Sequence, residues 1–254
     1  MARKQKQRNF MDILKNLEII QNQINLACTK SNRNPNEVKL LLATKTVSAE
    51  RIKIALNAGY TLIAENRVQE LKEKYNDLKD TPHTNHFIGH LQTNKIKDIL
   101  KCDVSCVESL DRYELAEKLH QRLSSENKTI EVFIQVNTSG EESKFGVHPD
   151  NAIDLVKKVS QLNTLKIKGL MTIGLFSSDV DKVRKCFRLL KQFQQEIASL
   201  QLPNVEVNEL SMGMSGDLEI AIEEGATIVR VGTAIFGERI YPDSFYWNEN
   251  KNNA

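Results

Sequence analysis

Short apolar runs alternate with longer stretches of helical period along most of this chain. In the first run, Leu40–Ala43 is continuously apolar, which is typical of a strand buried on both faces. Between the runs, apolar residues recur every three or four positions, as on one face of a helix. The runs that predict strands are Val38–Ala43, Leu62–Ala64, His86–Gly89, Val104–Val107, Val132–Val136, Ile167–Ile173, Val207–Met212 and Ile228–Val231.

Eight predicted strands that alternate with helices indicate parallel pairing through helical crossovers. Eight parallel strands close naturally into a barrel, and the 254 residues of the chain are close to the ~250 typical of that fold. A doubly wound open sheet is the alternative, but it would need a glycine-rich loop after the first strand, where Thr44-Lys45-Thr46 stand instead. We therefore predict an α/β fold, a single (β/α)8 TIM-type barrel domain over residues 1–254.

An extra helix should precede the barrel, because apolar residues recur at helical spacing from Phe10 to Ile24. We expect it to end before Ser31, and residues 1–8, which are polar and basic, to form a frayed terminus. The residues expected as N-caps of later helices are Ser48, Asp111 and Ser215.

Composition narrows the function classes. The net charge of +2 produces no global field that would attract nucleic acid or a membrane surface. No apolar run approaches the ~20 residues that a membrane-spanning helix needs. The four cysteines lack paired metal-ligand spacing and are expected to be free core thiols, and there is no signal peptide. We expect a cytoplasmic protein with no bound metal and no nucleic-acid or membrane partner.

Lys45 follows the first predicted strand almost at once. A lysine at the mouth of a buried strand is costly to desolvate unless its amine has a role. One interpretation is that its stem packs on the barrel while the ammonium reaches water. The other is an amine nucleophile that forms a Schiff base. The position of Lys45 alone leaves both open.

The loops after strands seven and eight favour the second interpretation, because these two loops often bind phosphate in this fold. Ser211 and Ser215 offer hydroxyl donors, and Gly213, Gly216 and Gly232 let backbone amides approach an anion. Ser215 also stands where a helix should begin, and helix N-termini favour phosphate. Each loop alone could be only a turn and a cap, but both together with Lys45 predict a phosphate ligand.

A phosphate site opposite an amine suggests pyridoxal 5′-phosphate (PLP), which needs both a phosphate grip and a Schiff-base lysine. A Schiff-base aldolase barrel is a competing chemistry, although its lysine usually lies on a later strand. Another alternative is a barrel that binds a different phosphorylated metabolite.

Six segments together resemble the pyridoxal-phosphate homeostasis proteins, a barrel family similar to the N-terminal domain of alanine racemase. They run in order through most of the chain and are specific as a set. The segments are Leu41–Thr46, Glu65–Glu70, Phe87–Lys95, Gly169–Thr172, Leu210–Ser215 and Arg230–Gly237.

The resemblance implies a role for each of seven residues. Lys45 would carry PLP as a Schiff base, and Asn66 would lie beside the ring or its 3-oxygen. Arg230 matches the arginine that faces the pyridine nitrogen in the related racemases; it can donate to that nitrogen but has no proton-accepting role, which weakens the cofactor as an electron sink. The residues implied for the phosphate are Ser215, Gly232 and Thr233, with Ser211 nearby.

The resemblance also implies a carrier. Only residues 238–254 follow Gly237, whereas a racemase would need a second domain with a tyrosine base from a partner subunit. We therefore expect a protein that buffers or delivers PLP, influences vitamin B6 and amino-acid balance, and has no strong catalytic activity. The alternative is a small PLP-dependent amino-acid racemase or lyase.

Partners and secondary residues follow from the same resemblance. PLP-dependent apo-enzymes would be the recipients of the cofactor, and we expect a monomer because the domain that supports the racemase dimer is absent. Many relatives carry a second lysine and a proline after the Schiff-base lysine, where Val47 and Ser48 stand here. Lys144 would lie near the site entrance or be a solvated loop residue, and His90 falls in a loop on the site side.

Overall fold

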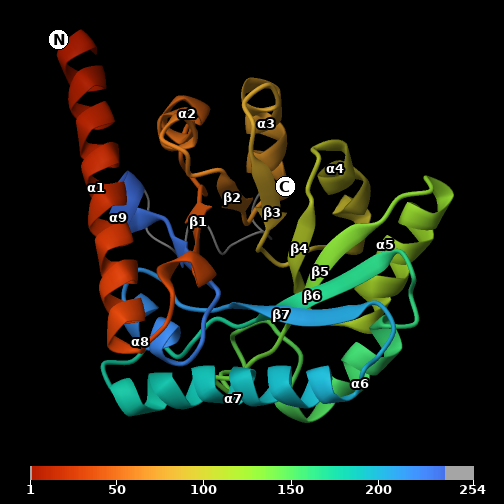
Figure 1. Ribbon diagram of the computed structural model, residues 1–254. Coiled ribbons are helices and arrows are strands. Elements are labelled where there is room, and N and C mark those ends of the chain that lie inside the picture. Colours follow the sequence, from red (N-terminus) through yellow and green to blue (C-terminus); the bar gives the residue numbers. More distant parts are fainter. Residues whose placement is uncertain (1, 238–254) are drawn as a thin grey trace.

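The computed structural model describes residues 2–237, with side chains from Phe10 onward. Its strands form a closed barrel in which each strand lies beside the next one in sequence and β8 pairs with β1. Every pairing is parallel, with Leu42 opposite Val231 where the barrel closes. This arrangement, seen in Figure 1, confirms the predicted (β/α)8 barrel. The strands are β1 (Lys39–Ala43), β2 (Leu62–Glu65), β3 (Thr84–Phe87), β4 (Cys106–Leu110), β5 (Ile130–Gln135), β6 (Leu165–Met171), β7 (Val205–Ser211) and β8 (Ile228–Val231).

Helices cover the outside of the barrel (Figure 1). The extra N-terminal helix, α1, begins at Ala2 and therefore includes most of the segment that we expected to fray; its Lys, Arg and Gln residues are good helix formers. The helices are α1 (Ala2–Lys30), α2 (Ala49–Asn57), α3 (Val68–Leu78), α4 (Ile96–Lys101), α5 (Tyr113–Ser125), α6 (Pro149–Val159), α7 (Val180–Ser199), α8 (Leu218–Glu223) and α9 (Thr233–Phe236), with short 3-10 turns at Pro35–Glu37 and Thr93–Lys95.

Two of the three predicted helix caps lie elsewhere. Ser48 is the N-cap residue of α2, although its side chain makes no capping hydrogen bond. Asp111 and Ser215 are not N-caps, because α5 begins after Arg112 and α8 after Asp217. In the second case the Asp217 carboxylate accepts the Met214 N–H at 2.6 Å and closes a turn that delays the helix.

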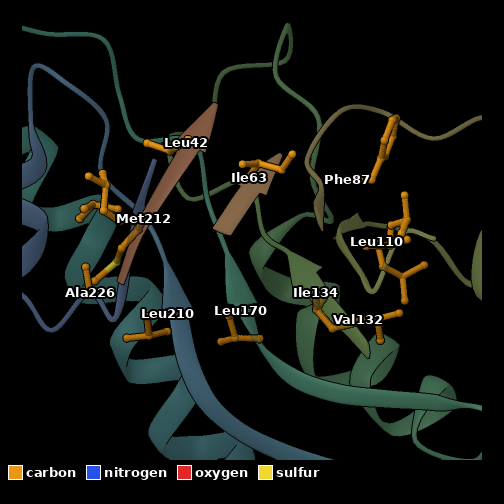
Figure 2. Packing of buried hydrophobic residues seen from close by; sticks show 14 of the residues in the cluster. Leu42, Ile63, Phe87, Leu110, Val132, Ile134, Leu170, Leu210, Met212 and Ala226 are labelled. Atoms are coloured by element: carbon orange, nitrogen blue, oxygen red, sulfur yellow. The ribbon is translucent and has the colours of Figure 1, made fainter. Parts of the chain in front are cut away.

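The apolar core has two parts. A large cluster lies between the strands and the helices, where Leu42, Ile63 and Leu170 point outward from the barrel (Figure 2). A smaller group fills the inside of the barrel with side chains from alternate strand positions. Its buried members are Leu41, Ala64, Cys106, Phe133, Met171 and Ile228.

Two expectations from composition can be compared with the structure. All four cysteines are buried and free, which confirms the prediction of core thiols. Within the described residues, none of the helices is long and apolar enough to span a membrane.

Candidate functional site

The loop that carries Lys45 starts directly after β1. Lys45 is half-buried, and the two threonines beside it are held from the neighbouring elements. The hydroxyl of Thr44 lies 2.6 Å from Glu65 Oε1, and the backbone N–H of Thr46 donates to Glu70 Oε2 at 2.5 Å. Thr46 has φ of +64°, a left-handed conformation that is unfavourable for a β-branched residue. Glu70 therefore holds the loop in a conformation that the chain would not adopt by itself.

Lys74 of α3 links these contacts. Its ammonium donates to the Thr44 carbonyl and to Glu65 Oε1, both at 2.8 Å, and to Glu70 Oε2 at 3.1 Å. Burial raises the pKa of Glu65, and the nearby ammonium of Lys74 and hydroxyl of Thr44 oppose this increase only in part. Lys74 thus compensates a buried carboxyl group and fixes the backbone next to Lys45 at the same time.

Arg230 occupies the neighbouring strand, β8. Its side chain is buried inside the barrel, where Nη1 donates to Ser211 Oγ at 2.9 Å and Nη2 to the Thr172 carbonyl at 2.8 Å. Burial lowers the pKa of Arg230, and the charges of Glu108 and Asp217 oppose the decrease. The guanidinium is therefore a buried cation with a fixed orientation.

The loop after β7 lies against strand β8, and the loops after β7 and β8 follow the same end of the barrel. The Arg230 N–H donates to the Gly213 carbonyl at 2.9 Å. Gly213 has φ of +92°, and a Cβ on it would lie 2.5 Å from that of Ala221, so no other residue fits there. Ser215 and Thr233 are exposed on these loops, and Gly232 is half-buried. These three residues form an accessible polar rim.

Ser211 does not belong to that rim. Its side chain is fully buried, and its only hydroxyl hydrogen is donated to Glu108 Oε2 at 2.5 Å. Ser211 accepts a hydrogen bond from the Arg230 guanidinium, so in this structure its hydroxyl hydrogen is already committed to Glu108.

Asn66 follows β2 at the same end of the barrel. Its carbonyl oxygen would lie 1.9 Å from a Cβ on Gly89, so the loops after β2 and β3 are in direct contact. Its side-chain Oδ1 is buried and has no hydrogen-bond partner among the residues that the structure describes. An unpaired buried amide oxygen is costly, and a ligand hydroxyl would satisfy it.

His90 and Lys144 lie on the loops after β3 and β5. The His90 ring stacks on Phe145, with centroids 4.1 Å apart and planes inclined by 19°. Lys144 donates to the Gly174 carbonyl at 2.8 Å and pairs with Glu141. Lys144 is therefore engaged with its neighbouring loops and is not simply a solvated side chain.

Comparison with known proteins identifies the family. The sequence matches the alanine racemase N-terminal domain family over residues 16–240. It is 44% identical to a pyridoxal phosphate homeostasis protein of Aquifex aeolicus, across 91% of this chain and 100% of that protein. The chain belongs to the pyridoxal phosphate homeostasis protein family. The family member of Escherichia coli K12 is 36% identical across 91% of this chain and 98% of its own.

Solved structures of family relatives have the same barrel. A protein of Bifidobacterium adolescentis has a TM-score of 0.86 at 38% identity, covering 90% of this chain and 96% of that one. PipY of Synechococcus elongatus, with PLP bound, has a TM-score of 0.74 at 33% identity, covering 86% of this chain and 100% of PipY. An alanine racemase of Clostridium difficile, 15% identical with a TM-score of 0.69, shares the fold alone.

The sequence analysis missed the residues that support this family site. Glu65 begins the segment Glu65–Glu70 that carries part of the resemblance, but nothing in the sequence pairs it with Lys74 of the following helix. Glu108 lies beyond the predicted end of the fourth strand at Val107, whereas β4 continues to Leu110. A carboxylate between apolar residues of one buried run was the available signal, because such a group is rarely buried without a partner.

Proposed function

We propose that this protein binds PLP at the C-terminal end of the barrel, with Lys45 as the covalent attachment point, and functions in PLP homeostasis. Relatives across nearly the full chain are named for that role, and a structure of PipY has PLP bound. The observation that carries the proposal is the position of Lys45 just after β1 and of Arg230 on the adjacent strand β8, with the surroundings of both held by hydrogen bonds.

The residues present fit this cofactor. The Oδ1 of Asn66, which has no hydrogen-bond partner in the described part of the chain, would accept a hydrogen bond from a hydroxyl beside the ring. A Cβ on Gly232 would lie 2.7 Å from the Ala43 carbonyl oxygen, so this position keeps its backbone accessible between β8 and β1. Ser215 and Thr233 contribute exposed hydroxyl groups to the same rim, as binding of a phosphate requires.

Each residue then has a defined task. When bound, PLP supplies an aldehyde that condenses with an amine and a ring that withdraws electrons. Lys45 would supply the amine, the rim of Ser215, Gly232 and Thr233 would hold the phosphate, and Asn66 would orient the ring. Arg230 would donate a hydrogen bond to the ring nitrogen without giving up a proton, which would leave the cofactor a weaker electron sink.

We propose a carrier, one that acts as a monomer in the cytoplasm and passes PLP to apo-enzymes that depend on it, because relatives across nearly the full chain are named for PLP homeostasis. Arg230 does not by itself separate a carrier from a racemase, since the related racemases have an arginine at the matching position, so an activity assay is needed. Incubation with L-alanine or L-serine should produce no D-isomer. Steady formation of the D-isomer by the natural protein, lost in Lys45→Ala, would show that the protein is an enzyme and not only a carrier. The molar mass measured by light scattering during size-exclusion chromatography tests whether the protein is a monomer.

An absorbance spectrum tests cofactor attachment. The purified protein with added PLP should show a visible band that borohydride removes, and mass spectrometry should then find the added mass on the peptide of Lys45. Lys45→Ala should lack the band, whereas Lys168→Ala, in the middle of β6 and paired with Glu206 near the start of β7, should keep it. Equal spectra for both variants would show that Lys45 is not the attachment residue. The absence of a band in the natural protein would show that it does not bind PLP as a Schiff base.

A further inference from the structure

A continuous chain of polar contacts crosses the inside of the barrel beneath Arg230. It connects four strands: His86 of β3, Glu108 of β4, Ser211 of β7 and Arg230 of β8. His86 Nδ1 lies 2.6 Å from Glu108 Oε1, Ser211 Oγ lies 2.5 Å from Glu108 Oε2, and Arg230 Nη1 lies 2.9 Å from Ser211 Oγ. All four side chains are at least nine-tenths buried.

Stability alone does not explain this chain of contacts. Burying a carboxylate and a guanidinium removes both from water, and apolar side chains of similar volume would often be equally stable or better. The same interior already contains an apolar layer that includes Leu41, Cys106 and Phe133. The polar contacts are better explained by their effect on Arg230, the member at the end where the cofactor would bind.

The direction of each hydrogen bond follows from the chemistry. An ionised Glu108 only accepts, so Ser211 donates its single hydroxyl hydrogen to it and presents a lone pair to Arg230. Two contacts, to Ser211 and to the Thr172 carbonyl, then fix the plane of the guanidinium, in which its remaining N–H donors lie. Without the charge of Glu108, Ser211 could turn and release Arg230.

We propose that Glu108 and His86 are positioning residues that aim Arg230 at the ring nitrogen of PLP. Glu108 acts through Ser211, and His86 fixes the Glu108 carboxylate from its other side. This inference rests on the proposed function. Burial raises the pKa of Glu108, but the hydrogen bond and charge of His86, the charge of Arg230 and the hydrogen bond of Ser211 outweigh burial, so the pKa lies below its usual value.

The test compares PLP with deaza-PLP, an analogue whose ring has carbon in place of the nitrogen. Dissociation constants for both are measured by titration on the natural protein and on Glu108→Gln, which removes the charge and keeps the shape. The natural protein should prefer PLP by roughly ten- to a hundredfold, the usual worth of a hydrogen bond to a charged group. In Glu108→Gln this preference should fall to within about threefold.

Two further variants keep the result interpretable. Ser211→Ala removes only the hydroxyl and should cause the same loss of preference even if Glu108→Gln folds poorly. Gln194→Met removes a buried amide of α7 that donates to the Val207 carbonyl, and it should keep the full preference. A merely structural role of Glu108 would lower the affinity for both ligands equally and leave their ratio unchanged.

The outcomes separate this inference from the proposed function. One outcome is that PLP binds and is trapped on Lys45 while Glu108→Gln and Ser211→Ala both prefer PLP over deaza-PLP as strongly as the natural protein does. In that case Glu108 does not position Arg230. If the natural protein binds both ligands equally, Arg230 does not contact the ring nitrogen and the inference also fails. If the natural protein binds neither ligand, the proposed function itself is rejected.

Discussion

Replacing Lys74 with methionine should destabilise the fold through Glu65. The side chains of Lys74 and Glu65 are 13% and 3% exposed, and their charged atoms are 2.8 Å apart. Removing one partner of such a buried pair costs about 3–5 kcal/mol, because the other charge is left uncompensated. Since Glu65 can escape part of this cost by taking up a proton, we expect a loss of about 3 kcal/mol at about pH 7.5.

The loss should depend on pH in a defined direction. Burial already raises the pKa of Glu65 in the folded protein, and Lys74 opposes that increase, so Lys74→Met should raise the pKa further. A carboxyl group whose pKa is raised in the folded state does not lower the free energy of unfolding at a pH below its unfolded-state pKa. The free energy that it removes grows as the pH increases from there to the folded-state pKa. The difference between variant and natural protein should therefore shrink when pH is lowered from about 7.5 to about 5.5.

Denaturant unfolding of the cofactor-free proteins, followed by circular dichroism, measures this loss. Lys72→Met is a matched control on the same helix. The side chain of Lys72 is 49% exposed, and its ammonium lies 3.5 Å from Asp98, farther than the 2.8 Å between Lys74 and Glu65. It should stay within about 0.5 kcal/mol of the natural protein. Equal losses for the two variants, or a Lys74 effect that grows at lower pH, would refute the reasoning.

Two other predictions concern the site. Gly232→Ala should destabilise the barrel by about 1–3 kcal/mol in the same unfolding assay, because the added Cβ would lie 2.7 Å from the Ala43 carbonyl oxygen. Gly216→Ala, with nothing within 4 Å of the added carbon, should have almost no effect, and equal losses would contradict the packing argument. Asn66→Ala should change apo stability by less than about 1 kcal/mol, because its Oδ1 makes no hydrogen bond within the described residues, yet weaken PLP binding about tenfold. An unchanged dissociation constant in an absorbance titration would remove Asn66 from the site.

The barrel could be predicted because short apolar runs recur between helical stretches, and some of these runs are apolar on both faces. Runs such as Leu40–Leu42 stay apolar whichever way successive side chains point, so their spacing along the chain is sufficient to count strands. The end of β4 was harder, because Glu108 and Ser109 interrupt the apolar pattern although both are buried. A polar residue in such a pattern suggests the end of the strand unless its hydrogen-bond partners, here His86 on β3 and Ser211 on β7, are known.

The candidate site was only partly predictable for the same reason. Lys45, Asn66 and Gly232 follow the ends of strands and Arg230 lies one residue before the end of β8, and a parallel barrel brings all such positions to one end. Their supports depend on pairings across the fold, such as Lys74 with Thr44, that sequence spacing does not encode. The turn at Asp217 is a local feature that the sequence also left undetermined, since Ser215 is an equally good capping residue.

The first helix of the chain has consequences for how the protein is made. Arg33, just after α1, donates to the carbonyls of Ile222 and Ala226, and the first of these contacts joins residues 189 apart in sequence. Asn16 likewise donates to the Ile235 carbonyl, and β1 pairs with β8. During synthesis, α1 leaves the ribosome before β8 and must therefore wait for that strand before these contacts can form. Because Lys45 and Gly232 lie on the two sides of the seam between β1 and β8, a ligand that joins them would bind only the closed ring and would stabilise it by mass action.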